Sequence, residues 1–159
     1  MEVKNNRAAA EWLEKDNNGY SLDDIRAWIA YHQQKPENLI LAIEDRTNEL
    51  IIGHAGLYDM DTASGTCTFG ILIGRPEYWH KGIGKAATVA MTDIAFHTPG
   101  IHTVRLHVLN EHTSAINMYM AVGFERVALL KDHTIKQGIP KDVLLMEKHH
   151  YGINDTLLS

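Results

Sequence analysis

Residues 78–87, YWHKGIGKAA, are the part of this sequence that decides the fold. Two glycines, Gly82 and Gly84, open a segment whose small and apolar residues then recur at helical spacing. The first backbone N–H groups of a helix and its dipole attract a phosphate group, and glycine lacks the Cβ that would keep the phosphate away. Because Lys81 and Lys85 add positive charge, this stretch predicts a phosphate-binding loop at the start of a long helix.

Three kinds of phosphate site compete for this loop. Residues 82–87 match the dinucleotide fingerprint G-x-G-x-x-[G/A], but residues 74–81 separate them from the preceding strand. Glu111, the nearest acidic residue past the next strand, also comes too late to bind a ribose. The Walker A pattern fails because Ala86 replaces its Ser or Thr and Trp79 replaces its first glycine. Coenzyme A is the remaining phosphate-bearing cofactor.

The rest of the chain alternates between helical and strand patterns. We expect helices over residues 6–16, 22–34, 83–97 and 113–120, and strands over residues 38–43, 50–58, 66–73, 103–109, 124–130 and 143–148. Ser21 is the expected N-cap of the second helix, residues 131–140 are expected to form a loop, and residues 151–159 a frayed tail. This order predicts an α+β domain with a central mixed sheet.

Two of these elements carry more detailed expectations. The run at 38–43 is typical of a buried strand, and Gly53 and Gly56 in the next strand predict a bulge or the close approach of another backbone. In the long helix the expected buried face consists of Ile83, Ala86, Ala87, Ala90, Met91, Ile94 and Ala95.

The loop and several later motifs together resemble the GNAT superfamily of N-acetyltransferases. The loop matches that family's pattern [R/Q]-x-x-G-x-[G/A], residues 73–79 are similar to the stretch before it, and 115–124 are similar to the A-x-x-x-Y-x-x-x-G-F region. Residues 138–142 before the last strand also recur there. The resemblance covers most of residues 7–149 and is closest to the branch of ribosomal-protein N-terminal and spermidine acetyltransferases. It implies one domain over residues 1–159 with a three-layer α/β/α arrangement and a mostly antiparallel sheet.

The resemblance also implies a set of site residues. Coenzyme A binding is expected at Ile71, Leu72, Ile73, Trp79, His80, Lys81, Gly82, Ile83, Gly84, Lys85, Ala86, Asn110, His112, Ala115 and Tyr119. Trp79 departs from the Arg or Gln of the family pattern, and His112 stands where Asn is common, so Asn110 and His112 both remain candidates for the pantetheine arm. We rank Asn110 slightly higher, because an amide both donates and accepts hydrogen bonds.

The chemistry of acetyl transfer assigns roles to some of these residues. A tyrosine, with an ordinary pKa near 10, is protonated at neutral pH, and the resemblance implies that Tyr119 is the acid that protonates the leaving thiolate. A backbone N–H in the strand 68–73 is expected to hold the oxyanion. Thr68 stands where some relatives carry a glutamate base, so Asp59, His54 and His107 are the candidates for a general base, and none is assigned.

Composition limits the classes of partner, the types of site and the cellular location that we expect. The net charge of −5 argues against a duplex nucleic-acid binder, and no stretch approaches 18 apolar residues, so we expect no membrane span. A single cysteine, Cys67, excludes an internal disulfide, and the ten histidines show no paired metal spacing, so no metal is expected. We expect a cytoplasmic protein, with a homodimer as one candidate assembly.

The expected function is direct, acetyl-CoA-dependent transfer of an acetyl group to a primary amine of a small molecule or a peptide N-terminus. A non-catalytic acyl-CoA-binding sensor on the same fold is the alternative, and a nicotinamide oxidoreductase is a weaker third. The identity of the acceptor is left open. Its pocket is expected to be built from the N-terminal helices, residues 58–65 and residues 131–140.

Overall fold

The computed structural model describes residues 22–150 of the chain. The elements are α3 (Leu22–Gln33), β1 (Leu39–Asp45), β2 (Leu50–Asp61), β3 (Thr66–Ile73), the short 3-10 helix η1 (Pro76–Tyr78), α4 (Ile83–His97), β4 (Thr103–Leu109), α5 (Thr113–Ala121), β5 (Glu125–Lys136) and β6 (Ile139–His149). The predicted helix at 6–16, the Ser21 cap and the tail at 151–159 lie outside the described residues. None of the helices described is long and apolar enough to cross a membrane.

The six strands form one sheet in the order β1-β2-β3-β4-β6-β5. Neighbouring strands run antiparallel, except that β3 and β4 run parallel. Parallel neighbours need a long crossover connection, and α4 supplies it between these two strands. The predicted α+β class with a mixed, mostly antiparallel sheet is confirmed.

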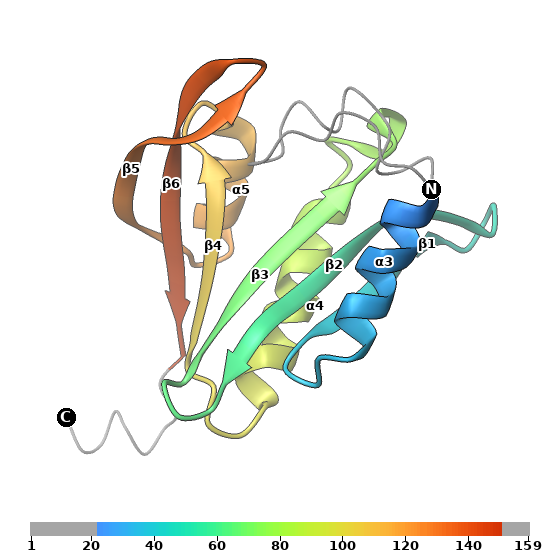
Figure 1. Ribbon diagram of the computed structural model, residues 1–159, viewed down its shortest axis with the longest axis horizontal. Helices are drawn as coiled ribbons and strands as arrows, with labels where there is room; N and C mark the ends of the chain where they lie inside the picture. Colours follow the sequence, from blue (N-terminus) through green and yellow to red (C-terminus); the bar gives the residue numbers. More distant parts are fainter. Residues whose placement is uncertain (1–21, 151–159) are drawn as a thin grey trace.

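Helices cover the sheet on both faces, as the alternation of side chains along β2 shows. Leu57 is fully buried in the core with residues of α4 and α5. On the opposite face, the rings of His54 and Tyr58 lie 5.4 Å from those of Trp28 and His32 on α3. Successive side chains of a strand point to opposite faces, so α3 and α4 form the two outer layers (Figure 1).

The buried face of α4 differs from the predicted one. Thr88, Met91, Thr92 and Ala95 are buried, whereas Ile94 is 38% exposed. The Thr88 hydroxyl donates to the Gly84 carbonyl at 2.7 Å, and the Thr92 hydroxyl to the Thr88 carbonyl at 2.9 Å. Because these bonds inside the helix satisfy the hydroxyl groups, two threonines lie in the core. Of the predicted face, Met91 and Ala95 are buried as expected, whereas Ala86, Ala90 and Ile94 are exposed.

The prediction that β1 is a buried strand is wrong. Leu41 is 41% exposed, and within the described part of the sheet β1 pairs with β2 alone. A run of apolar residues indicates a strand but does not say whether a layer covers both of its faces.

The prediction of a loop over residues 131–140 is also wrong. β5 continues to Lys136, and a tight turn at Gln137 and Gly138, with φ of 52° and 77°, leads directly into β6. Two successive residues with positive φ are typical of a two-residue hairpin turn. The polar composition of this segment reflects an exposed hairpin, and the start of β6 therefore lies at residue 139 instead of residue 143.

β3 and β4 stay together over only part of their length. Their pairing consists of Thr66 with Thr103, Cys67 with Val104, and Thr68 with Arg105. Past that point the two strands diverge, as Figure 1 shows at the top of the view. The backbone edge of β3 that follows Thr68 is thereby left open toward β4, which creates a wedge in the centre of the sheet.

Gly53 marks the predicted close approach of two backbones, between β2 and β3. A Cβ placed on Gly53 would collide with the carbonyl oxygen of Leu72, and it would lie 3.0 Å from the Cα of Ile73. A strand carbonyl cannot move aside as a flexible side chain can, so only glycine fits this position.

Replacing Gly53 with alanine is therefore expected to lower the free energy of unfolding by about 2 kcal/mol. Gly84 of α4 is the matched control, because its added Cβ would meet only Met118 and Ile73 side chains at 3.7 and 3.9 Å. We expect Gly84→Ala to cause no loss of stability. Urea unfolding followed by circular dichroism measures both variants, and equal stabilities would contradict the proposed backbone contact.

Candidate active site

A cavity of about 720 Å³ fills the wedge between β3 and β4. Its walls come from β2, β3, the loop after η1, the start of α4, β4 and α5. The lining residues are Tyr58, Thr68, Phe69, Gly70, Ile71, Leu72, Ile73, Tyr78, Trp79, His80, Gly82, Gly84, Lys85, His107, Val108, His112, Ser114, Ala115, Met118 and Tyr119.

Most of the residues predicted for coenzyme A binding meet in this cavity. Those that line it are Ile71, Leu72, Ile73, Trp79, His80, Gly82, Gly84, Lys85, His112, Ala115 and Tyr119. Lys81, Ile83, Ala86 and Asn110 are not among the lining residues. The Asn110 backbone N–H donates to the Asp142 carbonyl at 2.9 Å, which ties this residue to β6. Of the two candidates for the pantetheine arm, His112 is the one at the cavity.

The loop after β3 is anchored by side chains on both sides. The Trp79 indole N–H donates to the Ile73 carbonyl at 2.8 Å, so the residue that departs from the family pattern ties the loop to the end of β3. The Tyr78 hydroxyl donates to Asp45 Oδ2 at 2.6 Å. That bond lowers the pKa of the Asp45 carboxyl below its ordinary value and raises the pKa of the Tyr78 hydroxyl.

The backbone of the loop is turned for binding an anion. His80 has a φ of 59° and Gly82 a φ of 82°, both in the left-handed region. Left-handed residues among right-handed ones aim backbone N–H groups into a common concavity that suits a phosphate group. Gly82 is also the N-cap of α4. Because glycine has no side chain that could accept a hydrogen bond from the first N–H groups of the helix, these groups are available to a ligand in the cavity.

Tyr119 reaches the cavity from α5 and is held by the helix end that follows it. Gly123, with a φ of 105°, donates to the Met120 carbonyl at 3.1 Å, and Phe124 N–H donates to the Tyr119 carbonyl at 3.0 Å. These two bonds form a Schellman motif, in which a glycine ends a helix without steric cost. The Phe124 and Phe69 rings lie 5.7 and 6.4 Å from the Tyr119 ring.

Burial decides the protonation state of Tyr119. The residue is 8% exposed, and loss of contact with water raises the pKa of its hydroxyl to about 12. Desolvation disfavours the charged form, so the phenol keeps its proton through the neutral and mildly alkaline range. Tyr119 can therefore donate a proton inside the cavity.

The charge in the cavity differs from that of the whole chain. The chain carries a net charge of −5, yet the lining residues include Lys85, His80, His107 and His112 and no carboxylate. Burial, and then the neighbouring His80, lower the pKa of His112 below its ordinary value. The cavity is suited to a negatively charged ligand.

The candidate bases and the cysteine occupy different places. His107 lines the cavity, where its ring stacks on that of His133 at 6.1 Å. The His54 ring packs against Trp28 of α3. Asp59 is exposed, and its φ of 52° lies where the pairing of β2 with β3 is irregular. Cys67 is 2% exposed, and burial raises the pKa of its thiol to about 11, which leaves it protonated within the core.

Several cavity residues were not predicted as site residues, among them Gly70, Ser114 and Met118. Tyr58, predicted only as part of the acceptor-pocket segment 58–65, also lines the cavity, and its position shows which signal was available in the sequence. A Cβ on Gly56 would meet the Tyr58 ring at 2.5 Å and one on Gly70 would meet it at 3.3 Å, so the ring lies across two glycines that pair between β2 and β3. Two glycines that face each other on neighbouring strands leave room for a tyrosine ring to pack over them. The sequence contains the two glycines and the tyrosine, but only the register of the strands shows that Gly56 and Gly70 are opposite each other.

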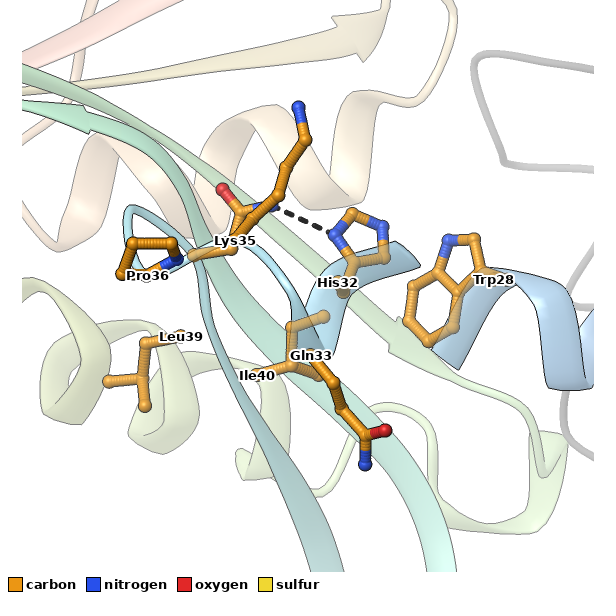
Figure 2. Close-up of a pocket in the computed structure, with 8 residues that line it drawn as sticks. Trp28, His32, Gln33, Lys35, Pro36, Leu39 and Ile40 are labelled. Atoms are coloured by element: carbon orange, nitrogen blue, oxygen red, sulfur yellow. Dashed lines mark hydrogen bonds between the residues drawn. The ribbon is translucent and has the colours of Figure 1, made fainter. Parts of the chain in front are cut away.

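A second cavity, of about 430 Å³, lies between the end of α3 and β1 (Figure 2). Trp28, His32 and Lys35 are among its lining residues, and the Asn38 side-chain amide donates to His32 Nδ1 at 2.9 Å. None of the predicted site residues lines it. The His32 ring, which lines the second cavity, packs against the ring of Tyr58, which lines the wedge, with the ring centroids 5.4 Å apart.

Within residues 22–150, no three histidine, cysteine or acidic side chains are grouped as ligands for a metal ion. Several histidines of the described chain stack on other rings, as His107 does on His133 and His150 does on Phe96 at 5.1 Å.

Comparisons with known proteins agree with this geometry. The acetyltransferase (GNAT) domain model matches residues 1–125. A curated relative, the uncharacterized N-acetyltransferase p20 of Bacillus licheniformis, is 27% identical over 108 residues, which is 68% of this chain and 60% of that protein. A crystal structure of spermidine N-acetyltransferase from Vibrio cholerae in complex with CoA and spermine superimposes with a TM-score of 0.84 at 22% identity, covering 98% of this chain and 88% of that one. The predicted family is therefore confirmed, and the chain belongs to the GNAT acetyltransferases.

Proposed function

We propose that this protein is an acetyl-CoA-dependent N-acetyltransferase that transfers the acetyl group directly to a primary amine. The observation that carries the proposal is the cavity in the wedge between β3 and β4. No carboxylate lines this cavity, and both the phosphate-binding loop and a buried, protonated tyrosine are part of its wall. Acetyl-CoA is a long polyanion that ends in a thioester, and a cavity with a phosphate-binding loop at one end and a proton donor at the other matches both parts. Membership of the GNAT family supports the same activity.

Each wall of the cavity has a part in holding acetyl-CoA. The backbone N–H groups at 80–84 bind the pyrophosphate, with Lys85 adding positive charge. The open edge of β3 at Ile71–Ile73 pairs with the pantetheine amides, as a missing strand would. His112 and Ala115 line the other side of that arm, at the start of α5.

The transfer itself needs an oxyanion site and an acid. The amine nitrogen attacks the thioester carbonyl, the C–S bond breaks, and the electron pair leaves on sulfur. A backbone N–H of β3 past Thr68 stabilises the oxyanion, since no strand partner occupies that edge. The Tyr119 hydroxyl gives its proton to the departing thiolate, and the proton released by the acceptor nitrogen passes through solvent to the Tyr119 phenolate, which regenerates the acid.

The acceptor is a primary amine, and polyamines are the first acceptors to test. The structure of a spermidine N-acetyltransferase in complex with CoA and spermine supports this choice. We also propose that the enzyme works in the cytoplasm and that it forms a homodimer.

The second candidate function is a sensor that binds acyl-CoA without catalysis. One observation favours it: the lining residues of the cavity include Thr68 but no carboxylate that would serve as a general base. Such a sensor would keep every cofactor contact described above and release no thiol.

Calorimetry and a thiol-release assay test the proposed function together. We expect acetyl-CoA to bind at micromolar concentration, and free coenzyme A thiol to appear when spermine, spermidine or another primary amine is added. Binding without thiol release across a broad amine panel would indicate the sensor. Absence of binding at millimolar acetyl-CoA would overturn both functions.

Replacing Tyr119 with phenylalanine removes the acid and keeps the ring that packs on Phe69 and Phe124. We expect kcat to fall by about 100-fold or more, while the Kd of acetyl-CoA changes less than threefold. Because the Tyr119 pKa is about 12, the wild-type rate should show no alkaline loss from this group below about pH 10. Tyr31→Phe, on the exposed face of α3, is the control, and a Tyr119→Phe enzyme with wild-type kcat would remove the acid role.

His107 is the one candidate base that lines the cavity, and an imidazole accepts a proton near neutral pH. We expect His107→Gln to lower kcat by about tenfold or more, with the Kd of acetyl-CoA unchanged. His97→Gln is the control, because His97 lies at the exposed end of α4 with Nδ1 on the Asp93 carbonyl at 2.7 Å. A His107→Gln enzyme with the kcat of wild type would contradict the assignment.

A further inference from the structure

Strand β5 contains a bulge at residues 131–133. Leu130 pairs with Val143 and Thr134 pairs with Lys141, so three residues of β5 stand opposite a single residue of β6. Bulges change the direction in which side chains leave a strand, and they are frequent next to active sites. The side chains of this bulge are therefore not confined to the directions that a regular strand allows.

A carboxylate of the neighbouring strand holds the bulge in place. Asp132 has a φ of 50°, in the left-handed region that aspartate enters more readily than most residues. Its backbone N–H donates to Asp142 Oδ1 at 2.9 Å. The Asp142 carbonyl in turn accepts from the Asn110 N–H at 2.9 Å. One residue of β6 thus ties the bulge to the turn between β4 and α5.

The bulge brings together two rings that a regular sheet would keep apart. β6 lies between β4 and β5 (Figure 1), and strands two places apart in a sheet are about 10 Å from each other. The His133 ring of β5 nevertheless stacks on the His107 ring of β4, with centroids 6.1 Å apart and planes 3° from parallel. Because side chains of a regular strand stand roughly perpendicular to the sheet, this contact across β6 depends on the bulge.

The orientation of the His107 ring depends on this contact. The ring lines the cavity, and the residue is exposed. Among residues 22–150, its side chain makes no hydrogen bond or ion pair, and His133 is its one ring contact. An exposed side chain without such bonds samples several rotamers, whereas a general base must point at the nitrogen whose proton it takes.

We propose that His133 is a positioning residue, whose ring holds His107 in the orientation in which it accepts a proton from the acceptor amine. This role rests on the proposed function, in which His107 is the candidate base, and it extends the machinery to a residue that does not line the cavity. His107 passes the proton on to water, so both rings are unchanged after each turnover. Because His133 acts by packing, the role requires an aromatic ring at position 133 and does not require its nitrogens.

Two substitutions of His133 separate the ring from its nitrogens. His133→Ala removes the ring, whereas His133→Phe keeps a ring that can stack. We expect kcat for thiol release to fall about three- to tenfold in His133→Ala and to stay within about twofold of wild type in His133→Phe, since an aromatic pair is a modest interaction. The Kd of acetyl-CoA should be unchanged in both. His97→Ala, at the exposed end of α4, is the control for loss of a surface histidine.

A double-mutant cycle shows whether His133 acts through His107. We expect His133→Ala to cause no further loss of kcat in a His107→Gln enzyme, because the ring to be oriented is then absent. A general effect of His133 on the fold would lower kcat equally in both backgrounds. Equal losses, or wild-type kcat in His133→Ala, would overturn the positioning role and leave the proposed function intact.

Nuclear magnetic resonance tests the ring contact without using activity. In protein with isotope-labelled histidine, the Hε1 resonance of His107 is assigned by its disappearance in His107→Gln. We expect this resonance to shift in His133→Ala, and also in Asp142→Ala, which removes the acceptor of the Asp132 N–H. It should not shift in His97→Ala. An unchanged His107 resonance in His133→Ala would overturn the positioning role. A shifted resonance in a protein that releases no thiol with any amine would instead refute the proposed function.

Discussion

The parting of β3 and β4 after the Thr68–Arg105 pair is the constraint on which the rest of this structure depends. A sheet whose strands stayed paired to their ends would have no edge in its middle and no central cavity. Here the crossover through α4 brings the two strands together at their starts only, and their directions then separate (Figure 1). The open edge of β3, the start of α4 and the start of α5 all face the space that results, so one topological feature assembles the site from three separate segments of the chain.

The same residues determine the packing and the protonation state of Tyr119 at the end of α5. Its Schellman motif needs a glycine at position 123 and an apolar residue at 124, and the Phe124 ring then packs on Tyr119. This explains physically why a tyrosine, three intervening residues, a glycine and a phenylalanine form one unit. The packing that holds the ring also excludes water from it, and exclusion of water is what raises the Tyr119 pKa.

Charge is distributed unevenly between the surface and the cavity. A chain with a net charge of −5 would on average repel a polyanion, so the binding of one requires that acidic side chains be kept away from the site. Within the described chain, the carboxylates of Asp45 and Glu111 are not part of the cavity lining, and they hold the surrounding elements in place by bonding to Tyr78 and Lys141. The loop thus uses its acidic neighbours as anchors and leaves the interior to N–H groups, imidazoles and Lys85.

Much was determined by sequence alone: the loop at 78–87, the bounds of β3 and β4, the strand–helix order and the cap at Gly123 all follow from local rules of glycine conformation and periodicity. Tertiary structure decided which residues are buried and which face the cavity, and local sequence rules do not determine these properties. Burial of Thr88 and Thr92 instead of Ile94 depends on which side of α4 meets the sheet. The exposure of β1 depends on its place at the described edge, and the choice between Asn110 and His112 depends on which side of the β4–α5 turn faces the wedge. The periodicity of apolar residues predicts that an element has an apolar face, whereas only the packing of the layers determines what that face contacts.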